Sequence, residues 1–325
     1  MTTYNKIYKF FDLAFGIQKN EFSLVQLFFI YITIICTGYT ITSTAAVTMF
    51  LGKTSQQILH TLLPWLYISN AVTIALVAKG YELLIDRLSR IKLITYTTVF
   101  FVLSFILIRF GIYFFSNQSW LYFFLMVWDE TCSVVFIMVF FSYLGDYFDV
   151  QNAKKVFGYI TGGMALGAPI GGFGSVILLH HLQPANLLFV SIGLLIASNY
   201  IALIIWKTGI APKRSATIAT HPKQIPLMKL FKNPYLQAIF IAYIVASICT
   251  AIEVYQLFYI ASTTLNEESL GKFMGKLFGY IGIAQLFIDF VLARILFKYV
   301  GVLNILLMLP ILFILLGFGF LTYPI

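Results

Sequence analysis

The sequence has 325 residues, of which 60% are hydrophobic, 18% aromatic and 10% charged, and its mean hydropathy is +0.92. Soluble domains carry about 25% charged residues, so this composition excludes a soluble protein and predicts an all-α polytopic membrane protein. The net charge of +9 is spread over short gaps between apolar runs, which excludes a basic face for nucleic acid and favours a role in orienting the chain in a bilayer.

Residues 1–21 place Ile7, Tyr8, Phe11 and Phe15 at helical spacing beside lysines, which predicts an interfacial amphipathic helix. The runs that follow reach the length of about 20 apolar residues that a helix needs to cross a bilayer. The nine predicted spans are 22–51, 58–80, 92–115, 119–144, 155–180, 184–206, 234–262, 273–298 and 301–324.

The basic residues predict the orientation of these spans. Most lysines and arginines fall on the side of the N-terminus, whereas the opposite loops hold only Lys53, Lys272 and Lys276. The positive-inside rule then places the N-terminus in the cytoplasm. With nine spans, the C-terminus would lie outside.

The cytoplasmic loop between the second and third spans reads KGYELLIDRLSRIKL and carries Asp86, Arg87 and Arg90. Their spacing is similar to the cytoplasmic signature of the major facilitator superfamily, in which an acid and basic residues clamp neighbouring helix ends. The alternative is a set of charges that only orient the chain.

The most informative stretch is 120–149, which has the character of a transmembrane helix with Asp129 and Glu130 near its middle. A carboxylate at bilayer depth costs roughly 2.5–3.5 kcal/mol on insertion scales, so it is seldom found there unless it faces a protein interior or an aqueous path. We therefore expect both acids to bind a solute or protons. The alternative is that they only hydrogen-bond a neighbouring helix.

The fifth span contains FGYITGGMALGAPIGGFGSV, in which small residues recur at intervals of four. Such spacing lets helix backbones approach closely, and a proline can loosen the local hydrogen-bond ladder, so the predicted role is helix packing. The residues concerned are Gly158, Gly162, Gly163, Gly167, Pro169 and Gly171. The span resembles the glycine-rich fifth helix of facilitator antiporters.

The longest polar interruption, 208–233, predicts a basic cytoplasmic loop between a six-span bundle at 22–207 and a partial bundle at 234–325. Secondary transporters are commonly built from repeated halves, with the substrate bound near the midplane between them. A second half of three spans means either that the chain is a fragment or that this division is wrong.

The second half adds Glu253, which lies at a depth similar to that of Asp129 in the equivalent span. Matched acids at the interface of two halves can bind a cationic group or relay a proton. Arg109 and Asp289 are secondary candidates: Arg109 can snorkel to the outer surface, and Asp289 can pair with Arg294 near the cytoplasmic end.

The sequence offers no support for catalysis or metal binding. His180 and His181 are adjacent in a short outer loop but lack a third ligand, so no metal site is predicted. No nucleophile, base and orienting group occur at a recognisable spacing. We therefore expect neither an enzyme nor a cofactor.

The chain resembles the ATP/ADP translocase-type nucleotide transporters and their bacterial relatives within the major facilitator superfamily. The likeness rests on LPWLY, YELLIDRLSRIKL, MVWDETCSVVF, NAKKVFGYI, NPYL, EVYQLFYIAS and the run from FGYIGIAQ through KYVG to MLP. It implies a major-facilitator-like helical bundle in a bacterial inner (plasma) membrane. It also implies a transport role for acids in helices four and seven, which match Asp129 or Glu130 and Glu253.

One difference from that family concerns the first span. The family carries basic residues there that meet the nucleotide phosphates, whereas the matching stretch here offers Ser43 and Ala46. A dry site with acids and no facing cation repels polyphosphate. Nucleotide exchange is therefore not expected.

The leading hypothesis is a secondary transporter that moves a small solute by alternating access. The carboxyls of Asp129, Glu130 and Glu253 would form its central site and couple transport to protons, and its partners would be the solute, protons and the lipid bilayer. The alternatives are a non-transporting membrane scaffold or sensor, and a lipid transporter.

Overall fold

The computed structural model describes residues 22–85, 88–148, 150–208 and 234–292, together with Tyr299 and Ile311. Every regular element within these ranges is helical. The elements are α2 (Phe22–Lys53), α3 (Gln56–Ile85), α4 (Arg90–Phe114), α5 (Ser119–Tyr147), α6 (Val150–Leu178), the 3-10 turn η1 (Pro184–Asn186), α7 (Leu187–Lys207), α9 (Pro234–Thr264), α10 (Glu267–Phe287) and the π-helical turn η3 (Ile288–Leu292).

Seven helices in the described part of the chain are long and apolar enough to cross a membrane, and they correspond to the first seven predicted spans. The predicted all-helical membrane bundle is thus confirmed. The interfacial helix at 1–21, the loop after Thr208 and the ninth span lie outside the described residues, apart from Ile311. The division of the bundle into two halves stays a prediction.

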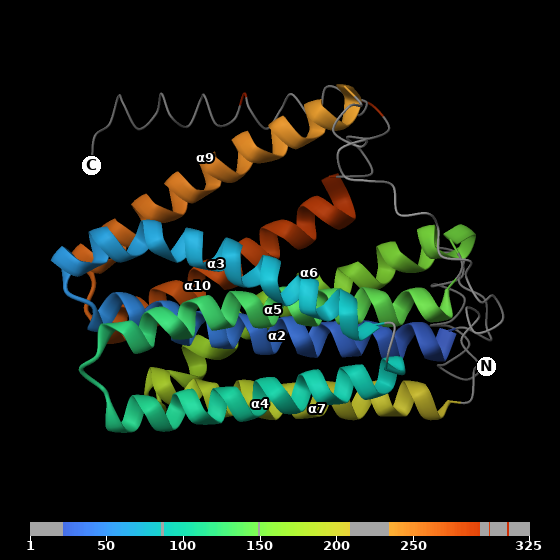
Figure 1. The fold of residues 1–325 in the computed structure, drawn as a ribbon, viewed down its shortest axis with the longest axis horizontal. Helices are drawn as coiled ribbons and strands as arrows, with labels where there is room; N and C mark the ends of the chain where they lie inside the picture. Colours follow the sequence, from blue (N-terminus) through green and yellow to red (C-terminus); the bar gives the residue numbers. More distant parts are fainter. Residues whose placement is uncertain are drawn as a thin grey trace.

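Helix α2 lies at the centre of the bundle and packs against α5, α6, α7 and α10 (Figure 1). Its buried residues extend over nearly its whole length. Several threonine hydroxyls of α2 donate to the carbonyl four residues earlier in the same helix, which satisfies these polar groups without a partner from another helix. The donors are Thr33, Thr37, Thr40, Thr42, Thr44 and Thr48.

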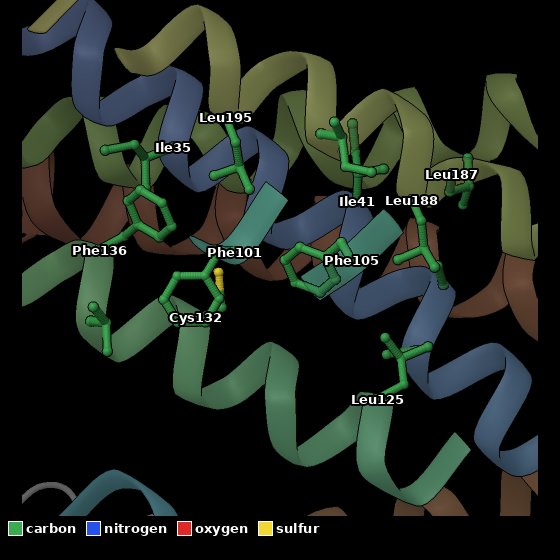
Figure 2. Close-up of a cluster of buried hydrophobic side chains, with 14 of the residues drawn as sticks. Ile35, Ile41, Phe101, Phe105, Leu125, Cys132, Phe136, Leu187, Leu188 and Leu195 are labelled. Carbon is green, nitrogen blue, oxygen red and sulfur yellow. The ribbon is translucent and has the colours of Figure 1, made fainter. Parts of the chain in front are cut away.

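One apolar cluster joins α2, α4, α5 and α7. Figure 2 shows Ile35 of α2 close to Phe136 of α5, with Leu195 of α7 beside them. Phe101 and Phe105 of α4 fill the space further along the helices. These side chains are 7% exposed or less, so the cluster is a closed core that holds the four helices in register.

The glycines of α6 bring its backbone against α2. A Cβ added at Gly163 would lie 2.8 Å from the carbonyl oxygen of Phe29, and one at Gly171 would lie 2.7 Å from that of Thr37. Gly167 meets the same helix between these points. Gly158, by contrast, is exposed, and nothing lies within 4 Å of an added Cβ there. Gly162 is buried.

The other side of α6 contacts α10 just as closely. A Cβ at Gly172 would collide with the backbone nitrogen of Gly279 and lie 2.6 Å from the carbonyl oxygen of Gly275. Pro169 lies against Gly282 in the same interface. Helix α6 is therefore in near-backbone contact with a helix on each side.

Many large apolar side chains lie on the outside of the bundle, where a soluble protein would carry polar residues. On α4 they include Leu103, Leu107 and Phe110, which are 55%, 70% and 57% exposed. These surfaces are where the acyl chains of a bilayer would contact the protein.

Helix α10 begins at Glu267, earlier than the predicted position 273. The Oδ1 atom of Asn266 accepts a hydrogen bond of 2.9 Å from the Ser269 amide and caps the helix. Glu267 and Glu268 follow in the first turn, where the helix dipole stabilises negative charge. The predicted start was too late because a span defined by its apolar residues leaves out this polar first turn.

The contact between α6 and α10 generates a first prediction. Gly172→Ala should lower the free energy of unfolding by about 1–3 kcal/mol, because the new methyl group overlaps the α10 backbone. The matched control is Gly174→Ala in the same helix, where nothing lies within 4 Å of an added Cβ. Both changes raise helix propensity equally. The measurement is unfolding of each variant by SDS titration in mixed micelles, and equal stabilities would contradict the packing described.

Candidate functional site

Asp129 lies inside the bundle on α5 and is 2% exposed. Its Oδ2 atom accepts a hydrogen bond of 2.8 Å from the hydroxyl of Ser43 on α2. Whereas most hydroxyls around it on α2 bond their own helix, that of Ser43 reaches across to the acid. A buried carboxyl is costly without a partner, so this contact joins α2 and α5 at the depth of the acid.

Glu130 is partly buried and faces the same helix. The hydroxyl of Tyr39 donates to its Oε1 atom over 3.4 Å, a long hydrogen bond. The hydroxyl of Ser133, one turn further along α5, donates to the Glu130 carbonyl over 2.9 Å. Two adjacent acids of α5 therefore each contact a hydroxyl of α2, from residues that lie one turn apart.

A small cavity of about 10 Å³ lies beside Asp129. This volume is at the lower limit for holding one water molecule. The cavity is bounded by α2, α4, α5 and α7, and Tyr39, Thr42 and Ser133 provide the polar part of its wall. Asp129 is the charged group in this lining, and no lysine or arginine belongs to it among the described residues. In this conformation the cavity next to Asp129 therefore has room for one water molecule at most, and the carboxyl itself can carry a proton.

Glu253 lies on α9 with its side chain exposed. Within the described ranges, no hydrogen bond or ion pair joins it to Asp129 or Glu130. Two residues of α9 that flank Glu253 in the sequence, Ala251 and Tyr255, each share a hydrogen bond with α3. The Tyr67 hydroxyl donates to the Ala251 carbonyl over 3.1 Å, and His60 Nδ1 lies 3.1 Å from the Tyr255 hydroxyl.

The secondary candidates lie at different depths. Arg109, near the C-terminal end of α4, donates from Nη2 to Asn186 Oδ1 over 2.7 Å, and its guanidinium lies 5.5 Å from the ring centroid of Phe189. Asp289 is exposed in η3, and its expected partner Arg294 lies outside the described residues. Among the described residues, no hydrogen bond joins Arg109 or Asp289 to Asp129 or Glu130.

The predicted cytoplasmic clamp is described only at Arg90, since Asp86 and Arg87 lie outside the described residues. Arg90 Nε lies 3.0 Å from Asp146 Oδ2, which ties the start of α4 to the end of α5. Asp146 is not among the residues that the sequence predicts for this clamp. Its position at the end of the span, among tyrosines, gives no periodic signal that would separate it from a solvated helix end.

At the opposite end of the bundle, an ion pair connects α2 with α10. Lys53 Nζ lies 2.7 Å from Glu267 Oε2, and Gly52 lies against the side chain of the same glutamate. His180 and His181 lie nearby in the turn between α6 and α7. Among the described residues, no group of three or more acidic, histidine or cysteine side chains is placed so that it could hold a metal ion.

Comparison with known proteins identifies the family. The sequence profile described as Major Facilitator Superfamily matches residues 27–325. The chain belongs to the major facilitator superfamily. Its members are generally transporters, and together with the helical bundle this makes the chain a multi-pass membrane transporter with a small-molecule substrate. No curated protein matches the sequence.

In this facilitator, sequence reasoning does not predict that Tyr39 and Ser43 are the hydrogen-bond partners of Glu130 and Asp129. In the sequence, Ser43 stands out only as a difference from the nucleotide transporters that the chain resembles. The serines and threonines of α2 are alike in the sequence, and which of them bonds across the interface depends on the rotation of α2 relative to α5. The sign of this role in the sequence is the large number of hydroxyl side chains in the first predicted span, 22–51.

The contact between Ser43 and Asp129 generates a second prediction for the facilitator. Ser43→Ala should lower the free energy of unfolding by about 1–3 kcal/mol, because it leaves a buried acceptor without its donor. Ser198→Ala is the matched control, since Ser198 is also a buried serine, 0% exposed against 8% for Ser43, but its hydroxyl donates to the Leu195 carbonyl of its own helix. SDS titration of both variants measures the difference. Equal losses would show that the contact across the helices adds nothing.

Proposed function

We propose that the protein is a secondary transporter that moves a small solute by alternating access, with Asp129 and Glu130 at its central site. The observation that carries this proposal is the pair of acids on α5, each bonded to a hydroxyl of α2 within a membrane-spanning bundle. Ionisable groups at this depth are costly and are kept where solutes or protons pass. Glu253 of α9 is the third carboxyl of the proposed site.

The chemistry of the site favours a neutral or cationic solute. The wall of the cavity beside Asp129 combines a carboxyl with hydroxyls, and no described lysine or arginine faces it. This argues against the polyphosphates carried by the ATP/ADP translocase-type proteins that the sequence resembles, because carboxylates repel them. We propose a related architecture with a different substrate class.

Protons are the proposed coupling ion. A carboxyl that is buried in one conformation and hydrated in another changes its proton affinity between them, which links proton movement to the conformational change. The glycine-rich α6 resembles the fifth helix of facilitator antiporters, so exchange of solute for protons is the proposed mode. We place the N-terminus in the cytoplasm of a bacterial cell and the chain in its inner membrane, following the positive-inside rule.

The third prediction tests the carboxyls. In proteoliposomes loaded with a pH-sensitive dye, a panel of amines, amino acids, nucleosides and sugars should include a solute that drives proton movement. Asp129→Asn and Glu130→Gln should each reduce that movement about tenfold or more, because a charge-assisted contact with the solute or proton is lost. Exchange of the radiolabelled solute measures its movement separately from that of protons.

The control for the carboxyl variants is Glu82→Gln, which removes an exposed acid that pairs with Lys79 on the surface of α3. This change should leave both readouts within experimental error of the unchanged protein. If neutralising Asp129 or Glu130 has as little effect as neutralising Glu82, the central acids have no part in transport.

The fourth prediction concerns the ion pair between Lys53 and Glu267. Since it joins α2 to α10 at the outer end, reversing one charge should favour separation of these helix ends. In a background without native cysteines, Lys53→Glu should make Thr48→Cys react about twofold to fivefold faster with a thiol reagent, as expected from the small free energies of exposed ion pairs.

The double change, Lys53→Glu with Glu267→Lys, should restore the slow reaction. Lys79→Glu, which disturbs the exposed pair with Glu82 inside α3, is the matched control and should have no effect. If the double variant reacts as fast as the single one, the ion pair does not hold the two helix ends together.

A further inference from the structure

A second, larger cavity lies at the outer end of the bundle, away from the central acids. Its volume is about 720 Å³, within the range of small-molecule sites. The ends of α2, α4 and α5, the turn between α6 and α7 and the start of α10 form its wall. Asp129 and Glu130 do not belong to its lining.

The charges around this outer cavity are paired, with one exception. Glu267 binds Lys53 at 2.7 Å. Glu268 pairs with Lys272 at 2.6 Å. The hydrogen bond from that ammonium group lowers the pKa of the Glu268 carboxyl below its ordinary value, so the carboxylate stays ionised and paired with the lysine. Among the described residues, no carboxylate lies within ion-pair distance of Arg109.

The guanidinium of Arg109 is held in place. Asn186 accepts from Nη2 at 2.7 Å, and the ring of Phe189 lies 5.5 Å away on one side. The Nε atom is buried and has no hydrogen-bond partner among the described residues. This buried nitrogen is not open to the cavity, and the one hydrogen bond of the guanidinium to a described residue comes from Nη2. A guanidinium held in this way is a preorganised receptor for an oxyanion, because its planar donors match a carboxylate or phosphate group.

We propose that the outer cavity is an oxyanion-binding site in which Arg109 anchors a carboxylate or phosphate group. His180, His181 and Tyr113 line the same cavity, and their side chains carry further hydrogen-bond donors. Lys53 also lines the cavity, so a bound anion competes with Glu267 for its ammonium group. The remaining volume accommodates the body of a larger anion.

This inference does not depend on the proposed transport activity, because it concerns a separate cavity and is tested by binding. The probes are radiolabelled inorganic phosphate and acetate, measured at equilibrium with the full chain in nanodiscs of phosphatidylcholine. At least one of them should bind saturably, and Arg109→Gln should weaken that binding about tenfold or more. Arg109→Lys keeps the charge without the planar fork and should give an intermediate loss.

The matched control is Lys276→Gln. It removes one positive charge from an exposed position of α10 that lies outside the cavity lining. It should change the affinity less than twofold if the anion binds at Arg109. An equal loss in Lys276→Gln and Arg109→Gln would show diffuse attraction to a basic surface and overturn the proposal.

A second arm distinguishes a soluble anion from a lipid headgroup. In nanodiscs that contain phosphatidylglycerol, native mass spectrometry reports the lipid retained by the protein. Retention that is lost in Arg109→Gln but kept in Lys276→Gln, without binding of free phosphate or acetate, assigns the site to a headgroup. Absence of both free-anion binding and Arg109-dependent lipid retention overturns the proposal.

Discussion

The close contact of α6 with α2 on one side and α10 on the other is the constraint on which the bundle depends. In a bilayer, apolar side chains gain little by leaving lipid, so helices associate chiefly through close packing and hydrogen bonds. Gly167 and Gly172 let α6 approach both neighbours to the distance of their backbones. The position of α2, and with it the reach of Ser43 toward Asp129, follows from this packing.

Several polar groups of the bundle have partners that suit their depth. The threonines of α2 are satisfied by their own helix and place no demand on its neighbours. Asp129 has no such local partner and takes a hydroxyl from α2 instead. The ion pairs of Arg90 and Lys53 lie at helix ends, where water and headgroups lower the cost of charge.

The two cavities differ in the charge that they present. The small one beside Asp129 is lined by that acid, a few hydroxyl side chains and apolar residues. The large one at the end of the bundle is lined in part by Arg109, which has no carboxylate partner among the described residues. A solute suited to one is poorly suited to the other. The central cavity therefore carries the transport proposal, and the outer cavity carries an independent proposal for anion binding.

The sequence by itself located the seven described helices that are long and apolar enough to cross a membrane, because a bilayer requires each span to be a continuous apolar helix. Helix α10, which overlaps the eighth predicted span at 273–298, is not among these seven. It also singled out Asp129 and Glu130, since isolated charges stand out in apolar runs. Helix α10 shows the limit of this reasoning, because its first turn is polar and its start depends on the cap at Asn266. Hydropathy does not detect such a start.

Only the tertiary structure decided which side chains meet. Ser43 and Asp129 are far apart in the chain, as are Arg90 and Asp146, and their pairing depends on how each helix is rotated about its axis. That rotation is set by the packing of small and large residues over whole interfaces, which a single sequence does not specify. The same reason explains why the charge of Arg109 was visible in the sequence while the cavity around it was not.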